Sequence, residues 1–239
     1  MTKLPSSLTK VVSRLLKILV LVLLVPVVLG LMRGILEQLE FTSLTGGRTF
    51  RTWLEWGVMS YVWTHLLLYR PTAIFRVSHR LFSLLAVWLF GGQVTSVQQS
   101  GGGKGGGKGA TGDPGSHGST LVAFSPYVVP LYTVLVCAAG WALGRWVGRA
   151  YVDGPVGFLI GATIAFHWLM SADDLQQQRE RWYVETYLLA IGLVFALTLI
   201  IGGACLPWAI PEFSFLRALA DGLANAQAIY ASLIERLFF

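Results

Sequence analysis

The residues best suited to chemistry begin at His79, inside the tract TAIFRVSHRLFSLLAVWLFGGQVTSV at positions 72–97. The motif H-E-x-x-H binds zinc because its two histidines share one helix face, and its glutamate takes a proton from metal-bound water. The letters HRLFS stand at those five positions here. The guanidinium of Arg80 cannot act as a base, and the hydroxyl of Ser83 is a poor zinc ligand. We therefore predict that this degenerate motif binds no metal and no cofactor.

A second group of polar residues follows a later apolar run, in the stretch FHWLMSADDLQQQRE at 166–180. It is the richest polar cluster of the chain and consists of His167, Asp173, Asp174, Gln178 and Glu180. Imidazole and carboxylate groups near one helix end are candidates for metal binding or acid–base work. The same composition is also typical of a helix that leaves the membrane into water.

Three stretches together resemble the membrane-embedded zinc metallopeptidases of the site-2-protease type, in particular a bacterial branch of that superfamily. They are residues 77–97, FSPYVVPLYTVL at 124–135, and the polar stretch at 166–180. That branch carries a histidine-glutamate helix ending in Leu-Phe-Gly-Gly, then Pro-Tyr-x-x-Pro-Leu-Tyr, then a histidine with Gln-x-acid downstream. The matching positions are 89–92, Pro126, Tyr127, Pro130, Leu131, Tyr132, His167, Gln178 and Glu180.

The resemblance covers roughly half of the chain, from about residue 55 to 182, and implies a membrane-embedded helical fold. It also implies a lost active site, because the catalytic glutamate and the second histidine are absent. Tyr132 stands where better-known relatives supply a third metal ligand, and tyrosine is an unlikely zinc ligand. On this interpretation the cluster around His167 is a remnant of the active-site region. A solvated helix at the membrane exit remains the alternative.

The composition excludes an ordinary soluble domain. The 239 residues are 54% hydrophobic and only 13% charged, and the mean hydropathy is +0.63. Soluble domains carry about 25% charged residues. The net charge of +6 does not indicate nucleic-acid binding, because the basic residues are scattered between apolar runs. Cys137 and Cys205 lie within apolar segments and predict no disulfide.

Hydropathy predicts an all-α polytopic membrane protein with about six spans. The spans are expected at 18–36, 52–69, 81–97, 121–144, 155–170 and 183–207. The third is short enough to be tilted or partly re-entrant. In the second, Glu55 is expected to reach the headgroups without a functional role, whereas for His65 a functional role and a non-functional one are equally favoured.

The predicted domain organisation is a basic amino terminus at 1–17, a transmembrane domain at 18–207 and a carboxy-terminal amphipathic helix at 208–239. A flexible Gly-rich loop is expected at 98–120, because it has little apolar surface to bury. With six spans, 11 of the 18 Lys and Arg residues fall on the side of both termini. The positive-inside rule then predicts that both termini are cytoplasmic. The bacterial resemblance favours the cytoplasmic (inner) membrane.

Two surfaces are candidate interfaces. Gly140, Gly144 and Gly148 repeat every four residues and predict a smooth helix ridge, a stronger signal than the single G-x-x-x-G at Gly30 and Gly34. The tail predicts an apolar stripe with spacings of three and four. Its members are Leu216, Leu219, Leu223, Ala226, Tyr230, Leu233 and Leu237. Charges on the same helix favour the membrane surface or docking on another helix over insertion across the bilayer.

These observations favour a catalytically inactive relative of intramembrane metallopeptidases that serves as a structural or assembly subunit of a larger membrane complex. Its partners would be the lipid bilayer and other membrane protein subunits, with no nucleic acid. One alternative is an active zinc hydrolase that uses His79, His167 and an acid from Asp173, Asp174 or Glu180. Another is a small transporter or channel component, which would lead us to expect internal repeats, and none is convincing.

Overall fold

Long apolar runs fold as helices in lipid, because each backbone polar group then finds its partner within the same segment. The computed structural model describes residues 6–41, 49–67, 72, 74–77, 80–81, 127–177 and 183–238. Within these ranges the chain is helical and contains no strand. The predicted all-α class is therefore confirmed. The expected third span at 81–97, apart from residue 81, and the Gly-rich loop at 98–120 lie outside the described residues.

The main helices are α1 (Ser6–Phe41), α2 (Phe50–Leu67), α5 (Leu131–Trp146), α6 (Arg149–Gln177), α7 (Val184–Ala209) and α8 (Phe215–Phe238). Three of them, α1, α6 and α7, are long and apolar enough to cross a membrane. The predicted membrane protein thus has structural support, whereas the count of six spans is not confirmed.

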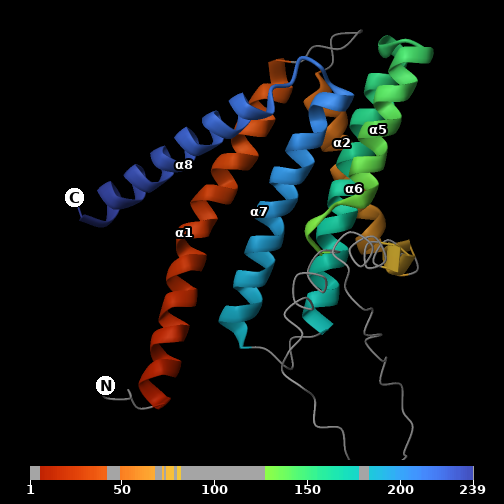
Figure 1. Ribbon diagram of the computed structural model, residues 1–239. Helices are drawn as coiled ribbons and strands as arrows, with labels where there is room; N and C mark the ends of the chain where they lie inside the picture. The colour runs from red at the N-terminus through yellow and green to blue at the C-terminus, as the bar shows by residue number, and fades with distance from the viewer. Residues whose placement is uncertain are drawn as a thin grey trace, which may run out of the picture.

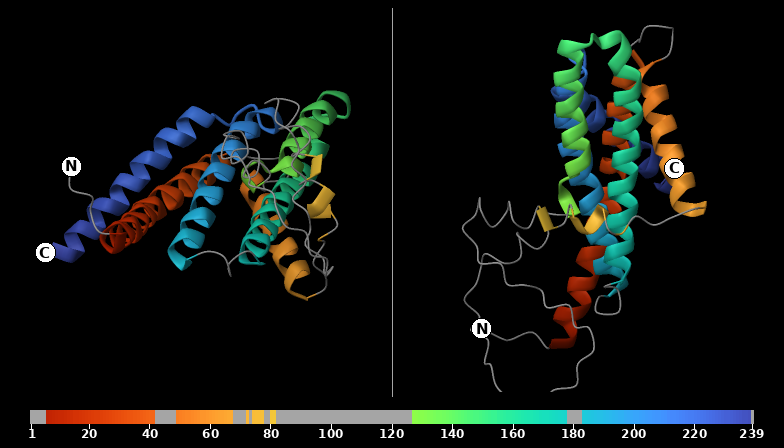
Figure 2. Two further views of the ribbon diagram at one scale, coloured as in Figure 1. Left: turned by 60° about the horizontal axis from the view of Figure 1, so that its bottom comes forward. Right: turned by 90° about the vertical axis from the view of Figure 1, so that its right-hand side faces the viewer.

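The helices form a bundle with one outlying member. Figure 1 shows α1 beside α7, with α2, α5 and α6 grouped on the other side of α7, and the helix contacts agree. α8 packs along α1 and then runs away from the other helices toward the carboxy terminus. The left view of Figure 2 shows the same outlying position of α8 beside α1. Part of α8 is therefore held by the bundle, and its last turns project from it.

Glycines bring α2 and α6 into backbone contact. A methyl group on Gly57 would lie 1.9 Å from the carbonyl oxygen of Phe158, and one on Gly161 would lie 2.0 Å from that of Leu54. Real side chains do not tolerate such distances, so only glycine permits this spacing. The two helices are parallel, because Phe50 meets Gly157 near one end and Tyr61 meets Phe166 toward the other.

Glycines also bring α1 and α8 into backbone contact. A Cβ atom on Gly30 would lie 2.4 Å from the carbonyl oxygen of Gly222, and one on Gly34 would lie 2.6 Å from that of Ala218. Farther along, the Tyr230 hydroxyl donates a hydrogen bond to the backbone carbonyl of Leu23. Later residues of α8 contact earlier residues of α1, so the two helices are antiparallel.

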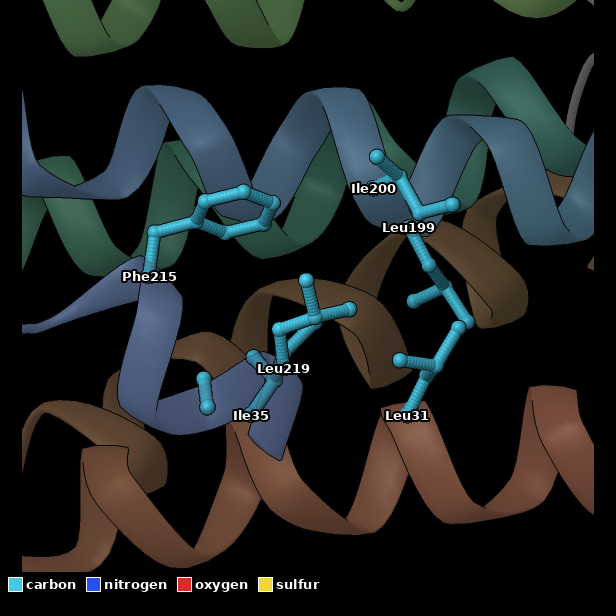
Figure 3. A pocket seen from close by; sticks show the side chains of 7 residues that line it. Leu31, Ile35, Leu199, Ile200, Phe215 and Leu219 are labelled. Atoms are coloured by element: carbon cyan, nitrogen blue, oxygen red, sulfur yellow. The ribbon is translucent and has the colours of Figure 1, made fainter. Parts of the chain in front are cut away.

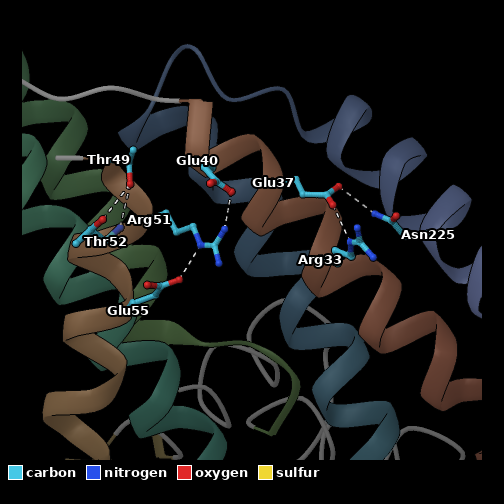
Figure 4. A network of polar contacts seen from close by, with 8 residues as sticks. All are labelled: Arg33, Glu37, Glu40, Thr49, Arg51, Thr52, Glu55 and Asn225. Atoms are coloured by element: carbon cyan, nitrogen blue, oxygen red, sulfur yellow. Dashed lines mark hydrogen bonds and ion pairs between the residues drawn. The ribbon is translucent and has the colours of Figure 1, made fainter. Parts of the chain in front are cut away.

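Charged residues gather at the two ends of the bundle. Figure 4 shows one end, where Arg51 pairs with Glu40 and Glu55 at 2.6 Å each, and Glu37 accepts from Asn225 of α8 at 3.1 Å. The hydrogen bond with Glu55 raises the pKa of Arg51 above its ordinary value. These contacts join α1 to both α2 and α8.

At the other end, Arg14 pairs with Glu185 at 3.3 Å and Lys17 donates to Thr186 at 2.8 Å. Between the two ends, residues 18–32 of α1 and 154–172 of α6 contain no Asp, Glu, Lys or Arg. At about 1.5 Å per residue these stretches measure roughly 22 and 28 Å. Both lengths approach the hydrocarbon thickness of a bilayer, about 30 Å.

Several helices extend beyond the bounds expected from hydropathy. Helix α1 begins at Ser6, so the predicted basic terminus at 1–17 is mostly the first turns of a long helix. The sixth span was expected to end at position 207, but Pro207 lies inside α7, which ends at Ala209. A proline in the last turn removes one backbone bond, and the neighbouring helices maintain the fold around it. Similarly, Pro155 lies inside α6 instead of starting it.

The helix directions also differ from the prediction. Six successive spans would alternate in direction along the chain. A single crossing at 81–97 would place the start of α5 at the end of the bundle opposite the end of α2. Instead, Tyr132 at the start of α5 and Tyr61 near the end of α2 both pack on Phe166. The end of α2 and the start of α5 therefore lie at the same end of the bundle.

Candidate functional site

The predicted polar cluster is placed in part. His167, Asp173 and Asp174 lie on the last turns of α6, and Gln178 and Glu180 lie outside the described residues. His167 is buried, whereas the two aspartates are half-buried. The helix turns these three side chains toward different neighbours, so the cluster is best described as two groups of contacts.

Tyr127 organises the first group. Its hydroxyl donates to the Asp174 carboxylate, and its backbone carbonyl lies 2.9 Å from His167 Nε2. With that nitrogen protonated, the imidazole donates to the carbonyl. Tyr127 belongs to the second stretch of the metallopeptidase-like pattern, and His167 belongs to the third. The structure thus brings two separate predicted motifs into direct contact.

The second group joins α2 to α6. His65 Nε2 lies 3.6 Å from an Asp173 carboxylate oxygen, and His65 Nδ1 lies 3.5 Å from the Tyr61 hydroxyl. His65 is buried at 9% exposure, although it carries an ionisable ring. Of the two roles left open for His65, a contact between helices is what the geometry provides.

Aromatic rings pack around Phe166, next to these polar groups. Its ring meets those of Tyr61, Phe75 and Tyr132 edge-on, with centroids 5.5 to 6.2 Å apart. Edge-to-face pairs of this kind stabilise a fold by about 0.5 to 1.5 kcal/mol each beyond their burial. The Tyr132 hydroxyl also donates to the Ile74 carbonyl at 2.9 Å. Tyr132, which the metallopeptidase resemblance aligned with a metal-ligand position, thus packs against Phe166 in the structure.

Metal chemistry requires several ligands at one point. Among the residues that the structure describes, no three His, Cys, Asp or Glu side chains converge on a possible metal position. Arg80 lies at an exposed position, and His79 and Ser83 lie outside the described residues. The described part of the cluster therefore links helices through hydrogen bonds. His65 contacts Asp173 and Tyr61, whereas His167 contacts the backbone of Tyr127.

The predicted glycine ridge is only partly formed. Helix α5 ends at Trp146, and Gly148 follows it with a φ of +99°, which glycine adopts readily. Gly140 packs within the bundle, since a Cβ there would lie 2.8 Å from Val156 Cγ1. A Cβ on Gly144 would meet only the Arg149 side chain, at 3.5 Å. Because α5 ends before Gly148, the three glycines do not lie on one helix face. The expected continuous glycine ridge is therefore not formed.

The predicted leucine stripe of α8 is divided between two environments. Figure 3 shows Leu219 with Phe215 at a small apolar gap, whose other walls are Leu31 and Ile35 of α1 and Leu199 and Ile200 of α7. Ala226 is buried against α1. By contrast, Leu216, Leu223, Leu233 and Leu237 are 45 to 76% exposed. Half of the stripe is thus covered by the chain's own helices, and half is bare.

Of the α8 residues that make the closest contact, the predicted stripe included Ala226 and missed Ala218 and Gly222. The residues that meet Gly30 and Gly34 are Ala218, Gly222 and Ala226, spaced by four. This small-residue repeat was a signal in the sequence, but the leucines of the same helix dominated the apolar pattern. The glycine pair judged weaker than the ridge on α5 proves to form a tight helix contact.

In the part of the chain that the structure describes, the fold is helical, with three helices fit to span a membrane and two groups of polar contacts at one end of the bundle. Comparisons of the chain with family models, with curated proteins and with solved structures found no match.

Proposed function

We propose that this protein is a catalytically inactive relative of the site-2-protease type that serves as a structural or assembly subunit of a larger membrane complex. The observation that carries the proposal is the bare half of the α8 stripe. Leu216 and Leu237 are 75 and 76% exposed on a helix whose other face is fixed to α1. Burying a leucine stabilises an assembly by roughly 1.5 to 3 kcal/mol.

Helix α8 is held firmly enough to present that surface. Its small residues meet α1 at backbone distance, as described above. Gln38 of α1 donates to Asp221 at 3.4 Å, and its side-chain oxygen accepts from the Ser214 backbone amide at 3.2 Å. A partner that binds the bare leucines would therefore dock on a preorganised helix, which lowers the entropic cost of association.

The core of the bilayer is a poor environment for the projecting end of α8. Glu235 and Arg236 lie among its last turns, next to exposed Leu233, Ile234 and Leu237. Placing a charged side chain at the centre of a bilayer costs about 2.5 to 3.5 kcal/mol on insertion scales. Water would leave the leucines uncovered. A protein partner accommodates both kinds of side chain.

The loss of catalysis rests on the substitutions at the degenerate motif. Arg80 replaces the base and Ser83 replaces a ligand, while His167 and Asp174 are engaged by Tyr127. In this proposal the former active-site region has become a structural contact between helices. We further propose a bacterial cytoplasmic membrane location with a cytoplasmic amino terminus. The basic residues Arg14 and Lys17 at the amino-terminal end of α1 support that orientation. The expectation that the carboxy terminus lies on the same side rested on six alternating spans, whereas α1 and α7 run parallel and α8 begins at the opposite end of the bundle.

The proposal is tested with the double variant Leu223→Asp and Leu233→Asp, purified in mild detergent from its native membrane. We expect the protein to remain inserted and folded but to lose the subunits that co-purify stoichiometrically with the wild type. A matched control is Ala224→Asp with Ala228→Asp, which adds the same charge at exposed positions outside the stripe. Retention of every subunit by the leucine variant, or equal loss in the control, would refute the scaffold function.

A further inference from the structure

The turn between α5 and α6 carries the two most exposed aromatic side chains in the described part of the chain. Trp146 at the end of α5 is 89% exposed, and Tyr151 in the first turn of α6 is 79% exposed. Trp141 lies farther back on α5 and is half-exposed. Contact between such large apolar rings and water is unfavourable, so a partner outside the chain is expected to cover them.

Two arginines flank the same turn. Arg145 is exposed, and its guanidinium lies over the Trp141 ring, 5.3 Å from the centroid. Stacking of this kind suits the planar guanidinium and holds it in one orientation. Arg149 is turned toward the bundle, where its Nη1 donates to the Ala209 carbonyl at 3.3 Å. Arg145 is therefore the cation that the turn presents beside its aromatic rings.

The position of the turn along the bundle identifies its surroundings. Figure 1 shows the turn at the end of the bundle where α1 and α7 also end, and the contact between Arg149 and Ala209 agrees. The charge-free stretch of α6 begins at residue 154, so Tyr151 lies just outside it. Likewise, residues 131–144 of α5 carry no charge and Arg145 follows them directly. Tryptophan, tyrosine and arginine at such a border are typical of the level where hydrocarbon meets headgroups.

The chemistry of the turn fits a phospholipid. A guanidinium pairs with phosphate oxygens through two parallel N–H groups. Indole and phenol rings place their apolar bodies against lipid and their polar atoms toward water. Leu143 and Val147, which are 48 and 59% exposed, extend the apolar part of the same surface. One cation among exposed apolar groups thus matches a phosphate above its acyl chains.

We propose that the α5–α6 turn is a phospholipid-headgroup site in which Arg145 binds the phosphate. Trp141 orients the guanidinium, and Trp146 and Tyr151 contact the glycerol backbone and the upper part of the acyl chains. The site lies on the membrane face opposite the amino-terminal end of α1. This inference rests on the membrane insertion of α6 and does not depend on the scaffold function.

The test identifies the lipid that lies beside Arg145 in a bilayer of known composition. Purified full-length protein carries a benzophenone amino acid in place of the exposed Val147, which follows α5 directly. It is reconstituted into vesicles with equal amounts of dioleoyl phosphatidylcholine and dioleoyl galactosylglycerol. The two lipids have the same acyl chains, and only the first has a phosphate. Neither has a net charge, so the overall positive charge of the protein does not select between them.

Mass spectrometry after illumination measures the ratio of the two lipid adducts. We expect the phospholipid adduct to exceed the galactolipid adduct by roughly three- to fivefold, the scale of one exposed ion pair. Arg145→Gln removes the charge and should return the ratio to that of the bilayer. Arg145→Lys keeps the charge but loses the planar fork, so an intermediate ratio is expected.

A matched control is Arg217→Gln. Arg217 is exposed near the start of α8, at the same end of the bundle but on another helix. Its replacement should leave the adduct ratio unchanged. Helical circular dichroism confirms that each variant is folded.

Three outcomes would overturn the proposal. The absence of lipid adducts would place the turn outside the bilayer surface. A wild-type ratio equal to that of the bilayer would show that the turn does not recognise phosphate. A phospholipid preference that survives in folded Arg145→Gln, or that Arg217→Gln removes equally, would show that Arg145 is not the group that selects the lipid.

Discussion

Gly57 of α2 lies so close to Phe158 of α6 that a methyl group added to the glycine would come within 1.9 Å of the phenylalanine carbonyl oxygen. Backbone cannot move aside as a flexible side chain does, so Gly57→Ala must separate the two helices. We expect a loss of at least about 2 to 3 kcal/mol in the free energy of unfolding, near the upper range for overpacked cores. Equilibrium unfolding in mixed detergent micelles, followed by circular dichroism, measures it.

Gly202 of α7 provides the control for this prediction. It is buried in a helix, yet a Cβ there would have no atom within 4 Å. Gly202→Ala should therefore be neutral or stabilising by up to about 1 kcal/mol, the helix propensity of alanine over glycine. Similar losses in the two variants would show that the α2 and α6 contact is not the cause.

The contact between α1 and α8 leads to a second prediction. Gly34→Leu places a branched side chain where Ala218 and Gly222 lie against the α1 backbone, so α8 should detach while the rest of the bundle stays folded. Spin labels at exposed Leu29 and Leu223 report the separation of the two helices by electron paramagnetic resonance. We expect a longer and broader distance distribution. Gly144→Leu on α5, where only a flexible arginine is near, should leave the distribution unchanged.

A third prediction concerns the hydroxyl of Tyr127. Tyr127→Phe removes the hydrogen bond to Asp174 and leaves the ring in place, so we expect a loss of about 1.5 to 3 kcal/mol in unfolding free energy. Asp174→Asn should cost less, because the amide oxygen still accepts from the hydroxyl. If the two residues act on each other, the double variant costs less than the sum of the single ones. Additive losses would contradict the proposed pairing.

The helical class and the positions of the longest helices follow from hydropathy alone. Residues 18–36 and 183–207 were expected to be helical; α1 contains the first range, and α7 contains the second from residue 184 onward. Such runs are predictable because lipid leaves the backbone no alternative to internal hydrogen bonding. The extension of α1 back to Ser6 is harder to predict, because polar residues are compatible with helix or loop.

Contacts between helices are less predictable than the helices themselves. The sequence indicated that His167, Asp173 and Asp174 share one helix end, but it could not pair Asp173 with His65, which is more than 100 residues distant. Likewise, every glycine in an apolar helix permits close packing. Which of them meets another backbone depends on helix crossing, and no local spacing encodes that. The spacing therefore ranked Gly140 above Gly30, although Gly30 is the glycine that meets another backbone.

The last prediction separates the inactive scaffold from the alternative hydrolase. A zinc enzyme needs several ligands and a base, and the degenerate motif keeps only His79 of its two histidines. We expect protein purified without chelator to contain no stoichiometric zinc by elemental analysis, and to cleave no transmembrane substrate. Incubation with excess zinc, followed by gel filtration, guards against loss of metal during purification. About one zinc per chain that disappears in His79→Ala and in His167→Ala would instead support a hydrolase with an unusual ligand set. In that case, the contact between His167 and Tyr127 would have to open to admit the metal.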